Sequence, residues 1–210
     1  MTRISAFIAL ACLLTATAQA DQIAVKNAGF EDPVQDVGGW SNDLPDWAGP
    51  TNAGDSFIEY IDTFHSEGNN HLGMAQGAEV SQDLGVPALP NTTYQMTVGV
   101  GRRNASFTVA GNLSTFGLYV GADALDGGTM LATASVDASL LAADLMFEDY
   151  SLTYTTGDTV PAGNLFVSLS STGVNRAHFD NIRIATVPEP ASFGLAVMGL
   201  LGLAARSRRR

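Results

Sequence analysis

The chain has 210 residues, a formal net charge of −11 at pH 7 and one cysteine. An acidic balance of this size repels a phosphate backbone, which argues against a nucleic-acid-binding protein. Cys12 lies in an N-terminal segment that we expect to be removed, so the mature protein has no disulfide.

The first 20 residues have the three parts of a secretory signal peptide. Arg3 supplies the positive charge, residues 4–14 are an apolar run, and Ala18 and Ala20 form a small-x-small cleavage pattern. We therefore predict a signal helix here, cleavage by signal peptidase, and a mature chain that begins at Asp21. The alternative is a buried N-terminal helix. Such a helix does not require a positive charge, an apolar run and a cleavage pattern in this order, so the signal peptide explains the sequence better.

Residues 21–186 are long enough for one domain with a sizeable core. Between the two end segments, twenty Asp and Glu stand against five Lys and Arg, a balance of about −15. Such a surface attracts divalent cations. The alternative is that the acidity only keeps an exported protein soluble.

Apolar and polar residues alternate along most of this domain. The period-two runs lie near residues 80–84, 94–100, 116–120, 150–154 and 165–169. Clusters of Gly, Asn, Asp and Pro separate them, and helical periodicity is nearly absent. The pattern predicts an all-β protein, built as an antiparallel sandwich or barrel.

Short motifs follow one another in a recognisable order: Asn27–Pro33, Leu44–Trp47, Val80–Leu84, Pro90–Val98 and Phe179–Ile184. This order resembles the galactose-binding-like jelly roll of many carbohydrate-binding modules. The resemblance implies an antiparallel jelly-roll β-sandwich over 21–186, flanked by the N-terminal signal helix and a C-terminal apolar helix.

Glu31 and Asp180 carry the metal prediction. In the folds that the chain resembles, the first and last strands are adjacent, and an acidic side chain on each helps to hold a structural calcium ion. Calcium takes six to eight oxygen ligands, carboxylates among them. We therefore expect a Ca²⁺ ion that joins the two ends of the domain. The alternative is that both carboxylates accept hydrogen bonds from turn amides.

Sugar binding by such folds uses aromatic platforms beside hydrogen-bonding side chains. The candidate ligand-binding residues are Trp47, Tyr60, Arg102, Arg103 and Asn104. Each aromatic has the alternative of a place in the core, and the two arginines have the alternative of internal ion pairs.

A second polar cluster consists of Glu59, Asp62, His65, Glu67 and His71. Turn residues surround it and its histidines lack the His-x-x-x-His spacing of one helix face, so we expect a solvated loop rather than a zinc site. His178 stands alone beside Asp180, and we expect it to pack or to cap.

Catalytic patterns are missing from the sequence: there is no Gly-x-Ser-x-Gly elbow, and no cysteine remains after export. We therefore predict a non-enzymatic surface or matrix protein that binds exopolysaccharide or another envelope component. The alternatives are a structural or adhesive protein without a small ligand and, third, an enzyme acting on polysaccharide.

The C-terminal segment has its own signature. Pro188, Glu189 and Pro190 interrupt regular structure, and an uncharged run over 191–205 leads to an arginine-rich end. A helix over that run spans about 22 Å, less than the roughly 30 Å hydrocarbon core of a bilayer. The three parts together resemble the Pro-Glu-Pro (PEP-CTERM) sorting signal of Gram-negative bacteria. The resemblance implies transient inner-membrane anchoring through 187–210, processing by an exosortase-type protease, and delivery to the envelope, surface or matrix.

The two predicted cleavages, at the N-terminus and at the C-terminus, can be tested by measuring the mass of the mature protein. In a host with exosortase, we expect the envelope-extracted protein to begin at Asp21 and to lack the residues beyond about Pro190, because both cleavages are covalent. Intact mass spectrometry measures the two ends at once, and a host without exosortase, where the tail should remain, is the control. A mature species from the exosortase host that keeps Arg206 would refute the processing of the tail.

Overall fold

The computed structural model describes residues 20–49, 56–122, 126–173 and 175–187. Within it, residues 21–186 form one compact unit. The predicted signal helix, the Pro-Glu-Pro motif and the predicted C-terminal helix fall outside the described residues. In the described part of the chain, no helix is long and apolar enough to cross a membrane.

The described residues contain short strands at the start and long ones afterwards. They are β1 (Gln22–Ile23), β2 (Trp40–Ser41), β3 (Ser56–Glu59), β4 (His71–Met74), β5 (Glu79–Pro87), β6 (Thr93–Arg102), β7 (Asn112–Val120), β8 (Thr129–Asp137), β9 (Met146–Thr155), β10 (Asn164–Gly173) and β11 (Ala177–Val187), with a 3₁₀ turn η1 (Ala138–Leu140) after β8. The alternating runs of the sequence lie in β5, β6, β7, β9 and β10.

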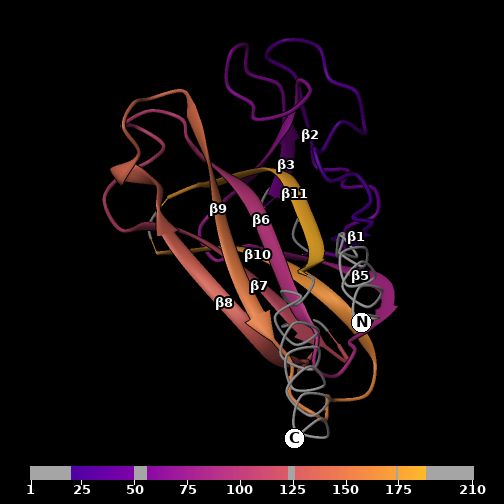
Figure 1. Cartoon of the computed structure of the whole chain (residues 1–210). Helices are drawn as coiled ribbons and strands as arrows, with labels where there is room; N and C mark the ends of the chain where they lie inside the picture. The colour runs from indigo at the N-terminus through magenta and orange to yellow at the C-terminus, as the bar shows by residue number, and fades with distance from the viewer. Residues whose placement is uncertain (1–19, 50–55, 123–125, 174, 188–210) are drawn as a thin grey trace, which may run out of the picture. The chain divides into compact units, whose positions relative to one another are not determined.

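The strands form two sheets that pack face to face as a sandwich (Figure 1). The larger sheet has the order β2-β3-β4-β11-β6-β9, with β1 paired to β11, and the smaller sheet has the order β5-β10-β7-β8. Antiparallel pairing joins β3 to β4, β4 to β11 and β6 to β9, and β1 meets β11 in the same way with Gln22 opposite Ala185. The pairs of the smaller sheet are also antiparallel. The predicted all-β antiparallel sandwich is confirmed.

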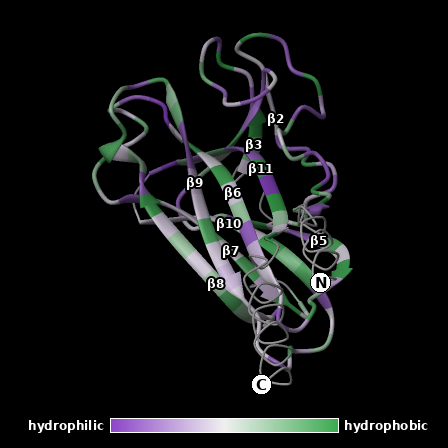
Figure 2. Ribbon diagram, in the orientation of Figure 1, coloured by the Kyte–Doolittle hydropathy of each residue, from purple (hydrophilic) through white to green (hydrophobic). Residues whose placement is uncertain are grey.

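One face of each alternating strand fills the space between the sheets. Val98 and Val100 of β6 and Val167 and Leu169 of β10 are fully buried there. Figure 2 shows the resulting pattern, with hydrophobic segments along the strands and hydrophilic segments gathered in the loops near β2. Since side chains alternate along a strand, the residues between these core positions point to the outer face of each sheet.

The outer face of the larger sheet is covered near its centre, and glycines of β6 make the room. A Cβ on Gly99 would lie 3.2 Å from Ser66 Oγ, in the segment that follows β3. A Cβ on Gly101 would lie 2.6 Å from the ring of Phe147, which belongs to β9. Side chains from loops and neighbouring strands therefore close over this face, and β11 contributes His178 and Asp180 to the covered region.

Candidate functional site

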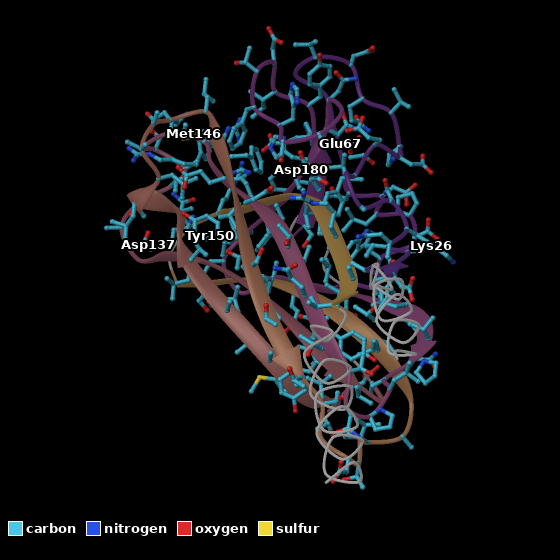
Figure 3. All side chains as sticks on the ribbon, in the orientation of Figure 1. Lys26, Glu67, Asp137, Met146, Tyr150 and Asp180 are labelled. Carbon is cyan, nitrogen blue, oxygen red and sulfur yellow. The ribbon has the colours of Figure 1, made fainter. Side chains whose placement is uncertain are left out.

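Two groups of polar side chains lie on this outer face. The acidic cluster consists of Glu31, Glu67 and Asp180, and the imidazole cluster consists of Glu59, His71 and His178. Figure 3 labels Glu67 and Asp180, which lie near each other at one end of the larger sheet. His178 and Asp180 are two residues apart on β11, so one strand presents a member of each cluster on the same face.

Asp180 is fully buried and its carboxylate accepts three backbone hydrogen bonds. The amides of Ser66 and Glu67 donate to Oδ2 at 2.6 and 2.9 Å, and the amide of Asn181 donates to Oδ1 at 2.7 Å. Burial raises the pKa of Asp180 to about 7, although the three amides act in the opposite direction, and the charge of Glu67 adds to the rise.

Glu31 accepts hydrogen bonds from the loop at residues 66–70, which also supplies two of the amides bound to Asp180. Its Oε1 accepts the amides of Asn69 and Asn70, both at 2.8 Å. Gly68 has a φ of +60°, and a Cβ there would meet the Glu31 carboxylate, so this loop needs glycine both for its backbone and for its close approach. The two predicted calcium ligands therefore meet on residues 66–70, and their amide contacts match the alternative that the sequence left open.

The imidazole cluster is assembled by three neighbouring strands. Glu59 of β3 and His71 of β4 are direct cross-strand partners, and Glu59 Oε1 lies 3.1 Å from His71 Nε2. His178 of β11 brings its Nδ1 to 3.7 Å from the same Oε1. Glu59 is 7% exposed and both histidines are fully buried. Among the described residues, this is the group in which three metal-ligating atoms lie within 4.8 Å of one another.

Aromatic rings and one arginine surround the imidazole cluster. The Phe64 ring lies 4.7 Å from the His71 ring and 5.2 Å from the His178 ring, measured between centroids. Phe147 packs against Phe64 at 4.7 Å. Arg103 Nη1 lies 3.3 Å from Glu59 Oε2, which pairs the buried carboxylate with a cation. The cluster therefore combines ionised and titratable groups with apolar walls.

Burial decides the charge of the two imidazoles. It lowers the pKa of His71, although the hydrogen bond and the charge of Glu59 act the other way. Burial also lowers the pKa of His178 well below its ordinary value, and the charges of His71, Arg103 and Arg176 lower it further. Both rings are therefore neutral near pH 7, and each keeps a nitrogen lone pair for a proton or an ion.

The structure corrects two expectations about these histidines. We expected a solvated loop at Glu59 and His71, but both lie on paired strands and are buried. We expected His178 to pack or cap alone, but it joins the other two. Strand pairing is the reason, because β3, β4 and β11 are neighbours in the sheet although they are distant in sequence. The sequence did hold a signal at β4, where His71 opens a run that continues with Leu72 and Met74.

Of the two aromatic residues predicted to bind a ligand, Trp47 is buried and Tyr60 is half-buried. Trp47 is 7% exposed, lies 5.3 Å from the Phe30 ring, and donates its indole N–H to the Asn27 carbonyl. Tyr60 follows β3 and is half-buried, with its amide bound to the Gly39 carbonyl. Trp47 belongs to the hydrophobic core.

The predicted polar run after β6 divides between two places. Arg102 binds the Asp144 carboxylate at 2.7 Å and donates to the carbonyls of Ser139 and Leu141. Arg103 belongs to the surroundings of the imidazole cluster. Asn104 uses its side-chain oxygen to accept the amide of Ser106. The fold therefore places Arg103, but not Arg102, beside Glu59.

Comparison with known proteins gives two matches that together span the domain and the tail. Residues 21–185 match the HpiC1 cyclase family, and residues 186–210 match the PEP-CTERM protein-sorting motif. No curated protein matches the chain in sequence. The sorting motif identifies an exported bacterial protein that is directed to the envelope or surface.

Solved structures of two cyclases share the fold of this domain, and a carbohydrate-binding module gives a weaker match. A Stig cyclase from Fischerella sp. TAU, crystallised with (3Z)-3-(1-methyl-2-pyrrolidinylidene)-3H-indole, is 22% identical, with a TM-score of 0.67 over 82% of this chain and 100% of that chain. A Fischerella sp. TAU cyclase with 4-(1H-indol-3-yl)butan-2-one gives 22% identity and 0.65 over 80% and 98%. A carbohydrate-binding module, TmCBM61 in complex with β-1,4-galactotriose, gives 15% and 0.44 over 76% and 95%.

The family match corrects one prediction from the sequence. A non-enzymatic domain was expected because no catalytic motif is present, but residues 21–185, nearly the whole domain, match a family of cyclases, which are enzymes. The motif argument fails because a catalytic site can be assembled from residues on separate strands, which leave no local pattern in the sequence. The chain therefore belongs to the HpiC1 cyclase family and carries a PEP-CTERM sorting motif behind its cyclase-like domain.

Proposed function

We propose that the protein is an exported cyclase-type enzyme that closes a ring in an unsaturated, largely apolar substrate, with the imidazole cluster as its reactive centre. One observation carries the proposal. In a domain of a cyclase family, Glu59, His71 and His178 meet in a buried position beside the rings of Phe64 and Phe147.

The chemistry of ring closure suits this arrangement. Charge develops on the substrate as one bond forms and another shifts, and fixed charges in a water-poor site stabilise it more strongly than water does. Glu59 and Arg103 supply a fixed pair of opposite charges, 3.3 Å apart. The two neutral imidazoles accept or return a proton, and the phenylalanine rings hold apolar carbon against these groups.

Aromatic substrates are the class to test first. The two Fischerella cyclases were crystallised with indole compounds. The half-buried ring of Phe147 offers a surface for a substrate ring of similar size, since aromatic pairs gain free energy beyond the area that they bury. We propose that an exosortase-type protease releases the protein from a transient anchor at the inner membrane. The released protein then meets its substrate outside the cytoplasm.

Calcium at the acidic cluster is a second, structural proposal. Glu31 and Asp180 both accept amides of the loop at residues 66–70, and repulsion from the charge of Glu67, in the same loop, helps to raise the pKa of Asp180. The pKa of Asp180, about 7 in the folded protein, lies above its ordinary value of 3.8, so the folded protein holds this proton more tightly than the unfolded chain does. That contribution to stability is present below about pH 4 and is lost as the pH rises through 7. A bound Ca²⁺ ion offsets the loss, because it favours the ionised carboxylate.

Polysaccharide binding is a further candidate function, and an exposed aromatic favours it. Trp40 on β2 is 64% exposed, and Val34 and Val37 beside it in the chain are 87% and 65% exposed. An indole ring in this position suits the stacking of a sugar ring. We propose it as a separate surface for attachment to the matrix, since these residues are not part of either cluster.

Activity gives the first test of this function. We expect the purified protein to convert at least one member of a panel of indole-containing and other unsaturated apolar compounds into a product of equal mass, detected by liquid chromatography with mass spectrometry. Glu59→Gln and His71→Asn should each lower the rate by about 100-fold or more, as the loss of a charge-stabilising group does. Asp62→Asn, on an exposed side chain nearby, is the matched control. Equal turnover by Glu59→Gln would remove the cluster from the reaction.

The calcium proposal predicts a pH-dependent response. Calcium should raise the melting temperature of the purified protein at about pH 8, where Asp180 is ionised, and much less at about pH 5, where it is protonated. Asp180→Asn should lose most of the response, and Asp158→Asn, an exposed carboxylate elsewhere, should keep it. If chelation leaves the melting curve unchanged at about pH 8 and elemental analysis finds no calcium, the carboxylates serve the loop amides alone.

Polysaccharide binding predicts retention on a glycan array that includes exopolysaccharide from the host. Trp40→Ala should abolish that retention because it removes the exposed ring, while Leu140→Ala, at a side chain that is 81% exposed, should not change it. An array on which the wild-type protein binds nothing would rule this surface out as a sugar site.

A further inference from the structure

We propose that Glu59, His71 and His178 bind a divalent transition-metal ion, and that zinc is the ion to test first. The binding of the ion follows from the cluster alone and does not depend on the proposed function. Its use as an electrophile in ring closure does rest on that function, and binding and turnover are measured separately.

The spacing of the ligand atoms is the first support. Donor atoms about 2.0–2.1 Å from a tetrahedral ion lie about 3.3 Å from one another. Glu59 Oε1 is 3.1 Å from His71 Nε2 and 3.7 Å from His178 Nδ1. All three donor atoms lie within 4.8 Å of one another, so small side-chain rotations suffice to bring them around one ion.

The kind of ligand selects the kind of metal. Two imidazole nitrogens and one carboxylate oxygen suit zinc, copper, nickel and iron, whereas calcium and magnesium prefer a full set of oxygens. Two histidines with one glutamate, and a fourth position left open, is the ligand pattern of catalytic zinc sites. The imidazole cluster is therefore chemically distinct from the acidic cluster, which offers oxygen alone.

Unsatisfied polar atoms are the second support. Neither ring nitrogen of His178 has a hydrogen-bond partner among the described residues, and Nδ1 of His71 has none either, although both rings are fully buried. A buried polar group without a partner is costly and rare in folded proteins, and where one occurs a bound ion often satisfies it. Coordination through His178 Nδ1 gives this ring the partner that the protein does not supply.

The residues and strands around Glu59, His71 and His178 hold these three side chains in position to bind an ion. Arg103 Nη1 lies 3.3 Å from both carboxylate oxygens of Glu59, and Oε1 also faces the two histidines. Carboxylates that bind metals are usually held in this way by a second hydrogen-bonding group. The three ligands lie on β3, β4 and β11, which are hydrogen-bonded neighbours, and ligands on strands are positioned more accurately than ligands on loops.

The competing interpretation is that Glu59 and His71 share only a hydrogen bond and that His178 packs against Phe64. The two interpretations differ in what His178 does. A hydrogen-bonded pair needs Glu59 and His71 alone, whereas a metal site loses affinity when any one of the three residues is replaced.

Cobalt gives the direct measurement, because Co²⁺ replaces zinc and absorbs visible light when it is bound in a tetrahedral site. The purified full-length protein, stripped with a chelator, should bind about one Co²⁺ per chain. Zinc should displace the cobalt, and elemental analysis of protein made in zinc-supplemented medium should find a similar ratio. Glu59→Gln, His71→Asn and His178→Asn should each remove the absorption.

Two further variants guard against misfolding and surface binding. Arg103→Lys keeps all three ligands and should weaken binding by about 10- to 100-fold, as the loss of a second hydrogen-bonding partner does. His65→Asn replaces the third histidine of the chain, which lies outside the cluster, and should bind cobalt like the wild type. Cobalt binding that survives His178→Asn, or that disappears with His65→Asn, would overturn the assignment.

The role of the ion in catalysis is measured by turnover, separately from its binding, which is measured by cobalt absorption. Stoichiometric cobalt binding that depends on the three residues supports the metal site even if no substrate is turned over, in which case the proposed cyclase activity alone fails. Turnover by the stripped, metal-free protein at the full rate would overturn only the role of the ion in ring closure. Failure of the stripped protein to bind cobalt would overturn the metal site and leave the proposed cyclase activity untouched.

Discussion

The alternation of β11 between the core and the outer face is the constraint on which both clusters depend. Ala177 and Phe179 belong to the hydrophobic core, so His178 and Asp180, which alternate with them, lie on the opposite face. Ile182 and Ile184 also belong to the core, so the alternation shifts by one residue between Phe179 and Ile182. Asn181 has a φ of 50°, a left-handed conformation that asparagine tolerates, and its amide binds the Asp180 carboxylate. Because β11 lies between β4 and β6 and also pairs with β1, its position is held on both sides.

Burial of charge is acceptable on this face only because each charge has partners. Asp180 receives three amides, and the Glu59 carboxylate contacts both His71 and Arg103. An unpaired carboxylate in either position would cost several kcal/mol, on the order of what holds a domain of this size together. The exception is His178, which is buried with no hydrogen bond from the described residues. That imbalance distinguishes the imidazole cluster from an ordinary buried ion pair.

The two matched segments of the chain, residues 21–185 and 186–210, have different functions. The PEP-CTERM motif concerns where the protein goes, and the cyclase-like domain concerns what it does. The roles that we propose for the acidic cluster, the imidazole cluster and the exposed Trp40 are separate: calcium binding at the loop of residues 66–70, ring closure, and attachment to the matrix.

The sequence by itself determined the sorting tail, the all-β class and the approximate positions of the long strands. These depend on local order: a run of residue types, or a period of two, which no distant contact needs to complete. The resemblance to carbohydrate-binding modules also pointed to Glu31 and Asp180, which both accept amides of the loop at residues 66–70. Only the tertiary structure decided that Glu59, His71 and His178 form one buried group, that Arg103 joins it and that Trp47 belongs to the core. The physical reason is that a β-sheet places residues side by side according to strand order and register, and here β4 and β11 are neighbours across a long stretch of intervening chain.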